Sequence, residues 1–198
     1  MKKSDLANQT SQKTIWISVT CLFIGFFIGV VVGVYRSGTI SESAGAGTVK
    51  AESNQLKAQI ENLKAATQKN PDDLDAWIRL GNAYFDSDQH EPSIQAYQKA
   101  LAIDSKNANV WTDMGVMYRL SKKPQEAIQA FDRAAQADPK HVVARINKGI
   151  VLLHDLKDRD SAIQAWESAL EIDPLTTFSS GQSLDEVLTQ LKKQEKQM

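Results

Sequence analysis

The longest uninterrupted apolar stretch of the chain lies near its N-terminus. From Ile15 to Tyr35 the sequence runs for 21 residues without a charged side chain. A helix rises about 1.5 Å per residue, so a helix of this length crosses a hydrocarbon core of roughly 30 Å. The pattern predicts one membrane-spanning helix over residues 15–35, preceded by a tail over residues 1–14.

A cleavable signal peptide is the alternative interpretation of the same stretch. The small residues Ala44, Gly45 and Ala46 downstream would suit a signal peptidase. The apolar stretch, however, is longer than the roughly 7–15 residues of a signal's hydrophobic region. Arg36 and Glu42 also separate it from the small residues. These features favour an uncleaved anchor.

Positively charged residues flank the stretch unevenly. Lys2, Lys3 and Lys13 precede it, whereas only Arg36 and Lys50 follow it closely. Because cytoplasmic flanks carry the excess of Lys and Arg, the N-terminus is predicted to lie in the cytoplasm. The remainder of the chain would then lie outside the cytoplasm. In a bacterial cell this arrangement describes a single-pass inner-membrane protein with a periplasmic domain.

Three glycines inside the stretch, Gly25, Gly29 and Gly33, are spaced by four residues. Glycine costs a water-exposed helix about 1 kcal/mol relative to alanine. In a bilayer, however, a row of small residues on one face lets two helices approach closely. We therefore expect this face to pack against a second copy or another membrane protein. The alternative is that glycine is simply frequent in membrane spans.

Beyond the apolar stretch the pattern changes twice. Residues 36–49 are rich in Gly, Ser and Ala without apolar periodicity, which predicts a flexible linker. From Lys50 onward, apolar residues recur at helical spacing and the sequence repeats itself. The segments SIQAYQKAL, AIQAFDRAA and AIQAWESAL begin at Ser93, Ala127 and Ala162, at spacings of 34 and 35 residues.

The beginnings of the units repeat with the same period. The residues Trp77, Leu80, Gly81 and Tyr84 recur 34 residues later as Trp111, Met114, Gly115 and Tyr118. This W-x-x-L-G-x-x-Y pattern resembles the signature of the tetratricopeptide repeat, a helical hairpin whose copies stack into a solenoid. The resemblance covers residues 71–174 as three repeats. It implies an all-α solenoid behind the membrane helix.

The third repeat departs from the pattern at its beginning. Arg145, Lys148 and Leu152 stand where Trp, Leu and Tyr are typical, although Gly149 is retained. Its one extra residue is predicted to fall in the turn near HDLKDRD. An insertion disturbs packing least in a turn, so the hairpin itself should be preserved.

Single helices are predicted to flank the three repeats. Residues 50–70 match the second helix of an incomplete preceding repeat, and a short coiled coil is the alternative because the apolar residues also fit heptad positions. Residues 175–198 are predicted to be a linker and a final capping helix. Ser183 and Glu186 form a capping box at the start of that helix.

The chain offers few candidates for catalysis or metal binding. Cys21 is the one cysteine, which excludes an intramolecular disulfide. His90, His141 and His154 are not spaced as metal ligands, and no nucleotide-binding, zinc-protease, serine-hydrolase or calcium-loop motif occurs. The net charge of −1, with no basic block, argues against nucleic-acid binding. The sequence predicts a protein without enzyme activity, metal or cofactor.

The resemblance implies where a ligand would bind. In tetratricopeptide proteins the first helix of each repeat lines a concave groove for peptides or partner helices. Its positions here are Ile78, Asn82 and Phe85, then Thr112, Val116 and Arg119, then Ile146, Ile150 and Leu153, with Asp75, Asn109 and Val143 at the leading edge. This floor becomes apolar toward the third repeat.

An apolar groove with a lone Arg119 suits an amphipathic helix of a partner protein. The alternative is that residues 175–198 of the chain itself cover the apolar end. Chaperone-binding relatives hold a terminal carboxylate with lysines, arginines and asparagines. Only Asn82 matches that pattern, and Ile78 stands where a lysine would be needed. A carboxylate clamp is therefore not predicted.

The architecture is similar to that of the tetratricopeptide subunits of bacterial cytochrome c maturation systems. This similarity implies a membrane-anchored scaffold that presents apocytochrome c to the haem-attachment machinery. Two alternatives share the same elements. One is a periplasmic chaperone or accessory factor of a secretion or envelope-assembly complex, and the other is a scaffold that assembles with copies of itself.

Overall fold

The computed structural model describes the backbone of residues 42–195 and the side chains of residues 53–193. The predicted membrane helix over residues 15–35, its glycine face, the preceding tail and residues 36–41 of the linker lie outside these residues. Between residues 42 and 195, no helix combines the length and the apolar character that crossing a membrane requires.

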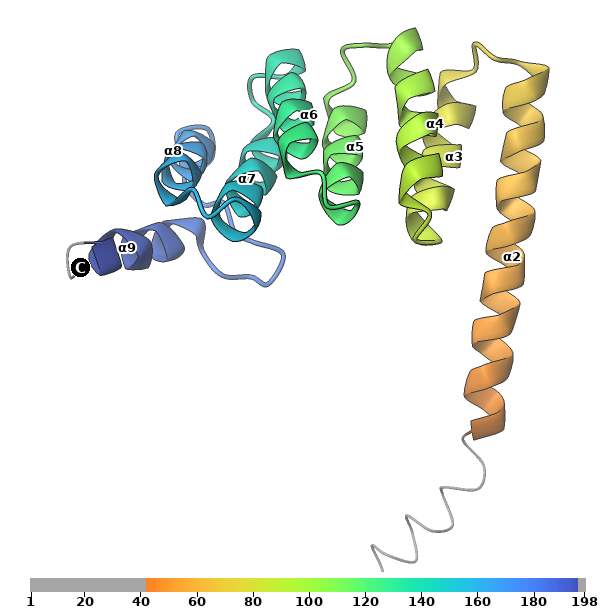
Figure 1. Cartoon of the computed structure of the whole chain (residues 1–198), viewed down its shortest axis with the longest axis horizontal. Helices are drawn as coiled ribbons and strands as arrows, with labels where there is room; N and C mark the ends of the chain where they lie inside the picture. The colour runs from red at the N-terminus through yellow and green to blue at the C-terminus, as the bar shows by residue number, and fades with distance from the viewer. Residues whose placement is uncertain (1–41, 196–198) are drawn as a thin grey trace, which may run out of the picture. The chain divides into compact units, whose positions relative to one another are not determined.

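The described part of the chain is helical, and its helices run in antiparallel pairs (Figure 1). The helices are α2 (Glu42–Lys69), α3 (Leu74–Asp86), α4 (His90–Ile103), α5 (Ala108–Leu120), α6 (Pro124–Ala137), α7 (Val142–Ile150) continued by the π-helix η1 (Val151–Asp155), α8 (Arg159–Leu170) and α9 (Leu184–Glu195). The pairs α3–α4, α5–α6 and α7–α8 are the three predicted repeats. The compact unit that contains them begins at Gln55.

Helix α2 begins earlier than the sequence predicts. It starts at Glu42, so residues 42–49 are helical although their composition predicts a linker. Extending an existing helix costs much less than nucleating one, so a favourable segment downstream can carry a weak segment with it.

Local signals fix where each repeat begins and turns. Asp73 and Asn107 cap α3 and α5 by accepting hydrogen bonds from the backbone N–H groups of Ala76 (3.0 Å) and Val110 (3.2 Å). Pro124 opens α6, where a missing N–H group costs nothing. These signals hold each hairpin in the same register as its neighbours.

Each hairpin closes where a glycine of its first helix meets an aromatic ring of its second helix. A Cβ atom on Gly81, Gly115 or Gly149 would lie 2.4, 2.5 or 2.2 Å from the ring of Tyr97, Phe131 or Trp166, respectively. The three rings are almost fully buried, at 1% exposure each. Glycine is therefore required at these positions by the close approach of the ring.

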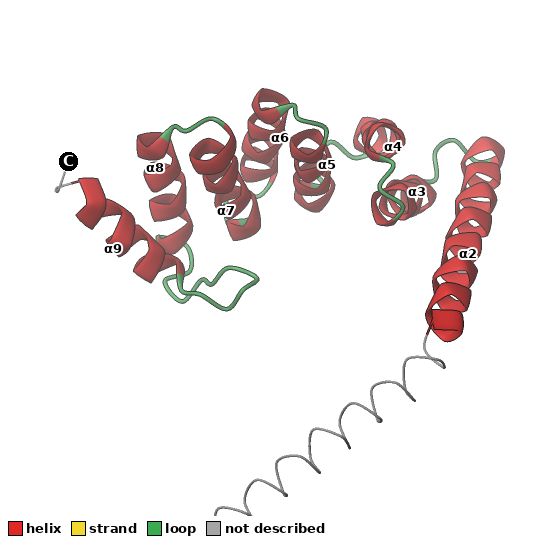
Figure 2. Ribbon diagram, turned by 60° about the horizontal axis from the view of Figure 1, so that its bottom comes forward, coloured by secondary structure: helices red, strands yellow, loops and turns green. Residues whose placement is uncertain are grey.

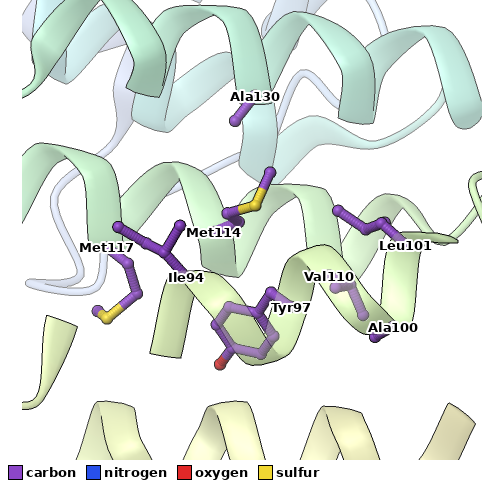
Figure 3. Packing of buried hydrophobic residues seen from close by; sticks show 8 residues of the cluster. All are labelled: Ile94, Tyr97, Ala100, Leu101, Val110, Met114, Met117 and Ala130. Carbon is purple, nitrogen blue, oxygen red and sulfur yellow. The ribbon is translucent and has the colours of Figure 1, made fainter. Parts of the chain in front are cut away.

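The core is a series of apolar clusters between successive helices. Figure 3 shows the cluster at the junction of the first two repeats, formed by Ile94, Tyr97, Ala100, Leu101, Val110, Met114, Met117 and Ala130. On the N-terminal side, Ile60 and Leu63 of α2 pack with Leu80 and Ala83 of α3. Residues 55–69 of α2 thus lie where the second helix of a preceding repeat would lie.

The C-terminal segment closes the other end. A long loop, seen in Figure 2 between α8 and α9, contains a single antiparallel bridge between Thr177 and Ser183. Leu184 and Leu188 of α9 are buried together with Ile163 and Trp166 of α8. Helix α9 is therefore packed onto the third repeat by its apolar face.

The extra residue of the third repeat lies inside the first helix of the hairpin. The first helices begin at Leu74, Ala108 and Val142, at equal spacings of 34 residues. The left-handed residues that follow them are Asp88, Lys122 and Lys157, at spacings of 34 and 35. The π-helix Val151–Asp155 absorbs the insertion, because a π turn accommodates one more residue than an α turn. The prediction that the turn absorbs it is corrected accordingly.

Candidate functional site

The nine predicted groove residues all lie on the first helices of the repeats. Their spacing of three or four residues places them on one face of each helix. Ile78, Asn82 and Phe85 lie on α3; Thr112, Val116 and Arg119 on α5; and Ile146 and Ile150 on α7, with Leu153 on η1. Their environments differ strongly between repeats.

In the first repeat the groove face is open and largely polar. The Asn82 side chain accepts a hydrogen bond from the Tyr97 hydroxyl at 2.7 Å. Burial is the main cause that raises the pKa of Tyr97, and the charge of Asp113 adds to it, so the hydroxyl stays protonated and keeps donating. Phe85 is 38% exposed, an unusual degree for a large apolar side chain.

In the second repeat the groove residues are partly used by the fold. Thr112 is only 5% exposed, and its hydroxyl donates to the Ala108 carbonyl and also contacts His141 Nε2, both at 2.9 Å. Arg119 is paired with Asp155 of η1 at 2.5 Å. The predicted lone cation is therefore half of an ion pair. The sequence could not show this pair, because the π-helix sets the position of Asp155.

Asp113 is a groove-side residue that the sequence reasoning missed. It is partly buried on α5, and burial raises the pKa of its carboxyl group. Asp86 on α3 also contributes to the raised pKa of Tyr97, so both carboxylates lie near the Tyr97 hydroxyl and Asn82. The sequence signal was their place next to predicted groove residues, Asp113 after Thr112 and Asp86 after Phe85. The first two repeats therefore carry an acidic groove face.

In the third repeat the apolar groove residues are covered in part by the chain itself. Ile146, Ile150 and Leu153 pack against the cluster to which α9 contributes Leu184 and Leu188. The Trp166 indole N–H donates to the Ile146 carbonyl at 3.0 Å, and its ring meets that of Phe178 edge to face, with centroids 5.5 Å apart.

The prediction of an open apolar end is therefore corrected. The alternative, in which residues 175–198 cover that end, describes the third repeat. The apolar residues have this arrangement because the α8–α9 loop is long enough to bring the capping helix back onto the repeat.

Three exposed apolar side chains remain on the first helices. Phe85 on α3, Leu120 on α5 and Val143 on α7 are 38%, 45% and 53% exposed. Leu120 was not among the predicted groove residues, although it directly follows Arg119. Across residues 53–193, no group of three or more His, Cys, Asp or Glu side chains is arranged to hold a metal ion. The described surface is thus one for binding by apolar and acidic groups.

Comparison with protein-family models gives two matches within the repeats. Residues 81–121 match a model described as a TPR repeat, and residues 108–141 match a model described as a tetratricopeptide repeat. No curated protein matches the chain. The matched residues include the first two predicted repeats in large part.

Solved structures show the same fold at low sequence identity. The crystal structure of MamA is 23% identical, with a TM-score of 0.57, over 65% of this chain and 74% of that one. The first TPR of Spaghetti (RPAP3), bound to the HSP90 peptide SRMEEVD, is 21% identical, with a TM-score of 0.53, over 61% and 90%. The OM64 TPR domain from Arabidopsis is 20% identical, with a TM-score of 0.53, over 61% and 95%. The described residues therefore form an all-α tetratricopeptide solenoid.

Proposed function

We propose that this tetratricopeptide solenoid is a scaffold that binds a segment of a partner protein on the face formed by its first helices. The observation that carries the proposal is the row of exposed Phe85, Leu120 and Val143 on three successive first helices. Large exposed apolar side chains that recur on one face are typical of protein-interaction surfaces. The structure of the RPAP3 repeat with an HSP90 peptide supports this use of the fold.

The acidic groups define which partner segment suits this face. Asp86 and Asp113 lie near Asn82, where they would repel the terminal carboxylate that chaperone-binding relatives hold. An amphipathic segment with apolar anchors and a basic residue near the first two repeats is the complementary ligand. The lack of a carboxylate clamp, predicted from Ile78, points in the same direction.

Crosslinking can test the proposed face directly. A photoreactive phenylalanine analogue at Phe85 should form adducts with a partner in native membranes. The same analogue at Ile103, which is 41% exposed at the end of the second helix α4, is the matched control. Adducts at Phe85 alone are expected. Identical adduct patterns at the two positions would reject the groove as the binding face.

We further propose that residues 15–35 anchor the scaffold in the inner membrane, with the repeats on the periplasmic side. The uneven flanking lysines and the length of the apolar stretch support this orientation. Reporter fusions at the C-terminus separate the two sides: alkaline phosphatase should be active and a cytoplasmic fluorescent reporter should not. The reverse pattern would place the repeats in the cytoplasm.

Within that setting, presentation of apocytochrome c during cytochrome c maturation is the pathway we favour. The architecture supports it: one anchor, three repeats and a groove that accepts a polypeptide. A secretion or envelope-assembly accessory factor is the second candidate. Purification of the intact chain from membranes should recover haem-lyase components in the first case and translocon components in the second.

Association through the membrane helix is a separate proposal. The four-residue spacing of Gly25, Gly29 and Gly33 supports a homodimer or docking onto a larger membrane protein. Substitution of Gly29 by Ile should abolish association in a membrane two-hybrid assay. If full association persists, the glycine face is not the contact. A self-assembling scaffold that uses the groove would remain associated in the absence of the anchor.

A further inference from the structure

The three repeats contain clefts at equivalent positions, each on the side of the second helices. The first helix contributes three residues to each cleft, in the order of the repeat pattern. These are Trp77, Leu80 and Tyr84 in the first cleft, Trp111, Met114 and Tyr118 in the second, and Arg145, Lys148 and Leu152 in the third. The second helices contribute Gln95, Gln129 and Gln164 at matching positions.

The third cleft is the largest of these three. Its volume is about 550 Å³, compared with about 260 Å³ for the first cleft and about 200 Å³ for the second. Cavities that bind ligands typically measure roughly 300–1,000 Å³, so only the third cleft reaches this range. The physical reason is the sequence: two aromatic side chains that fill the other clefts are missing at Arg145 and Leu152.

The third cleft combines an apolar floor with a cationic rim. The floor includes Phe131, Ala144 and Leu152, which are 1%, 0% and 6% exposed. On the rim, Lys148 is paired with Asp132 at 2.5 Å. Arg145 donates one hydrogen bond to the His141 carbonyl, which leaves donors of its fork facing the cleft region. With Asp132 neutralising Lys148, Arg145 gives the lining a net positive charge.

This cleft is not part of the groove. Successive residues of a helix turn by about 100°, so Arg145, Lys148 and Leu152 lie on a different side of the first helix from Ile146 and Ile150. The groove residues of the third repeat pack toward α9, whereas the cleft opens between α6 and α8. A ligand could therefore occupy the cleft while a partner segment occupies the groove.

We propose that the third cleft binds an aromatic side chain of a partner polypeptide, next to a carboxylate of the same polypeptide. The first two clefts identify the aromatic group, because Trp77 and Trp111 fill the corresponding space from within the chain. Arg145 identifies the carboxylate, because a guanidinium binds a carboxylate oxygen and also stacks on an aromatic ring. The partner supplies in trans what the third repeat lacks.

Two blocked dipeptides test the proposal on the purified full-length chain. Acetyl-Trp-Glu-amide should bind with a dissociation constant of about 1 mM, which is typical for a ligand of this size. Acetyl-Trp-Lys-amide should bind more weakly, because its charge opposes Arg145. Saturation-transfer NMR on the ligand measures both.

Two variants and one control localise the binding. Gln164→Trp places a bulky side chain at the cleft, and Arg145→Trp with Lys148→Leu restores the pattern of the other repeats. Both should abolish the transfer to acetyl-Trp-Glu-amide. Gln129→Trp, the equivalent change at the closed second cleft, should leave it intact. The restored variant is also expected to unfold at a temperature at least as high as the parent chain, which keeps the loss interpretable.

Several outcomes would overturn the proposal. These are the absence of transfer with the parent chain, equal transfer with both dipeptides, and transfer that survives in the restored variant. Loss of transfer in Gln129→Trp as strongly as in Gln164→Trp would also overturn it, since the effect would not belong to the third cleft. Because the groove is untouched by these variants, crosslinking at Phe85 should proceed in all of them.

Discussion

The first two repeats and the third share one hairpin design but use their surfaces in opposite ways. In the first two, Trp and Tyr of the first helix fill the cleft, and the groove face remains open with Phe85 exposed. In the third, Arg145 leaves the cleft open, and the apolar groove residues are packed beneath the C-terminal segment. The glycine–ring contact is common to all three. Hairpin closure is thus separable from what the hairpin exposes.

The largest expected effect comes from removing the ring at the centre of the third repeat. Trp166→Ala should lower the free energy of unfolding by about 3–5 kcal/mol, because it empties a fully buried site and also removes the hydrogen bond to Ile146. Denaturant unfolding followed by circular dichroism measures this loss. Hydrogen exchange should also become faster in α9, since Phe178 loses its edge contact.

Phe131→Ala is the matched change in the second repeat. It should cost a similar free energy, because Phe131 is equally buried, but it should leave the protection of α9 unchanged. This difference in location is what distinguishes the capped repeat from the open ones. If the two substitutions loosen α9 to the same extent, the third repeat does not hold the cap independently.

A smaller difference is expected between the glycines that meet these rings. Alanine gains about 1 kcal/mol of helix propensity over glycine, whereas overpacking costs about 1–3 kcal/mol. Gly149→Ala should be more destabilising than Gly115→Ala, because Trp166 is held by a hydrogen bond and an edge contact and has less freedom to move than Phe131. Thermal unfolding of the two variants compares them. Equal unfolding temperatures would mean that the ring contacts are equally yielding.

The hairpins and their period could be predicted from sequence because their causes are local. Gly81, Gly115 and Gly149 recur with the rings that they meet, and each pair can be recognised at a fixed spacing. The capping residues Asp73 and Asn107 are likewise local. The fold of residues 71–174 therefore follows from short-range patterns.

The groove could be predicted only in outline, because its properties depend on contacts between distant residues. The pair of Arg119 with Asp155 joins residues 36 positions apart and depends on a π-helix within α7–η1. Composition also gives no register for the insertion, which is absorbed by a helix turn. Coverage of Ile150 depends on how far the α8–α9 loop returns, which is a matter of tertiary packing.

The ion pair across the junction of the second and third repeats should have a modest effect. The Arg119 and Asp155 side chains are 36% and 32% exposed, so their coupling should be about 0–1 kcal/mol. A double-mutant cycle with Arg119→Ala and Asp155→Ala measures it, and the coupling should decrease when salt is raised. A coupling that is absent even at low salt would mean that the π-helix positions Asp155 without energetic help from Arg119.

The smallest effect should appear in the pH dependence at the same junction. Burial, assisted by the charge of Arg145, holds the pKa of His141 below its ordinary value, although Asp138 opposes the shift. The folded protein therefore binds a proton at His141 less readily than the unfolded chain, whose histidine titrates near pH 6.5. Stability should be complete above that pH and should decrease as the pH falls below about 6.5.

The His141→Gln variant isolates this contribution. Glutamine can still bond to Thr112, which contacts His141 Nε2 at 2.9 Å, but it does not titrate. Between about pH 7.5 and about pH 5.5, the unfolding temperature of the parent chain should decrease more than that of the variant. Parallel decreases would show that the junction between the open repeats and the capped one is insensitive to protonation of His141. The acid sensitivity would then arise elsewhere in the chain.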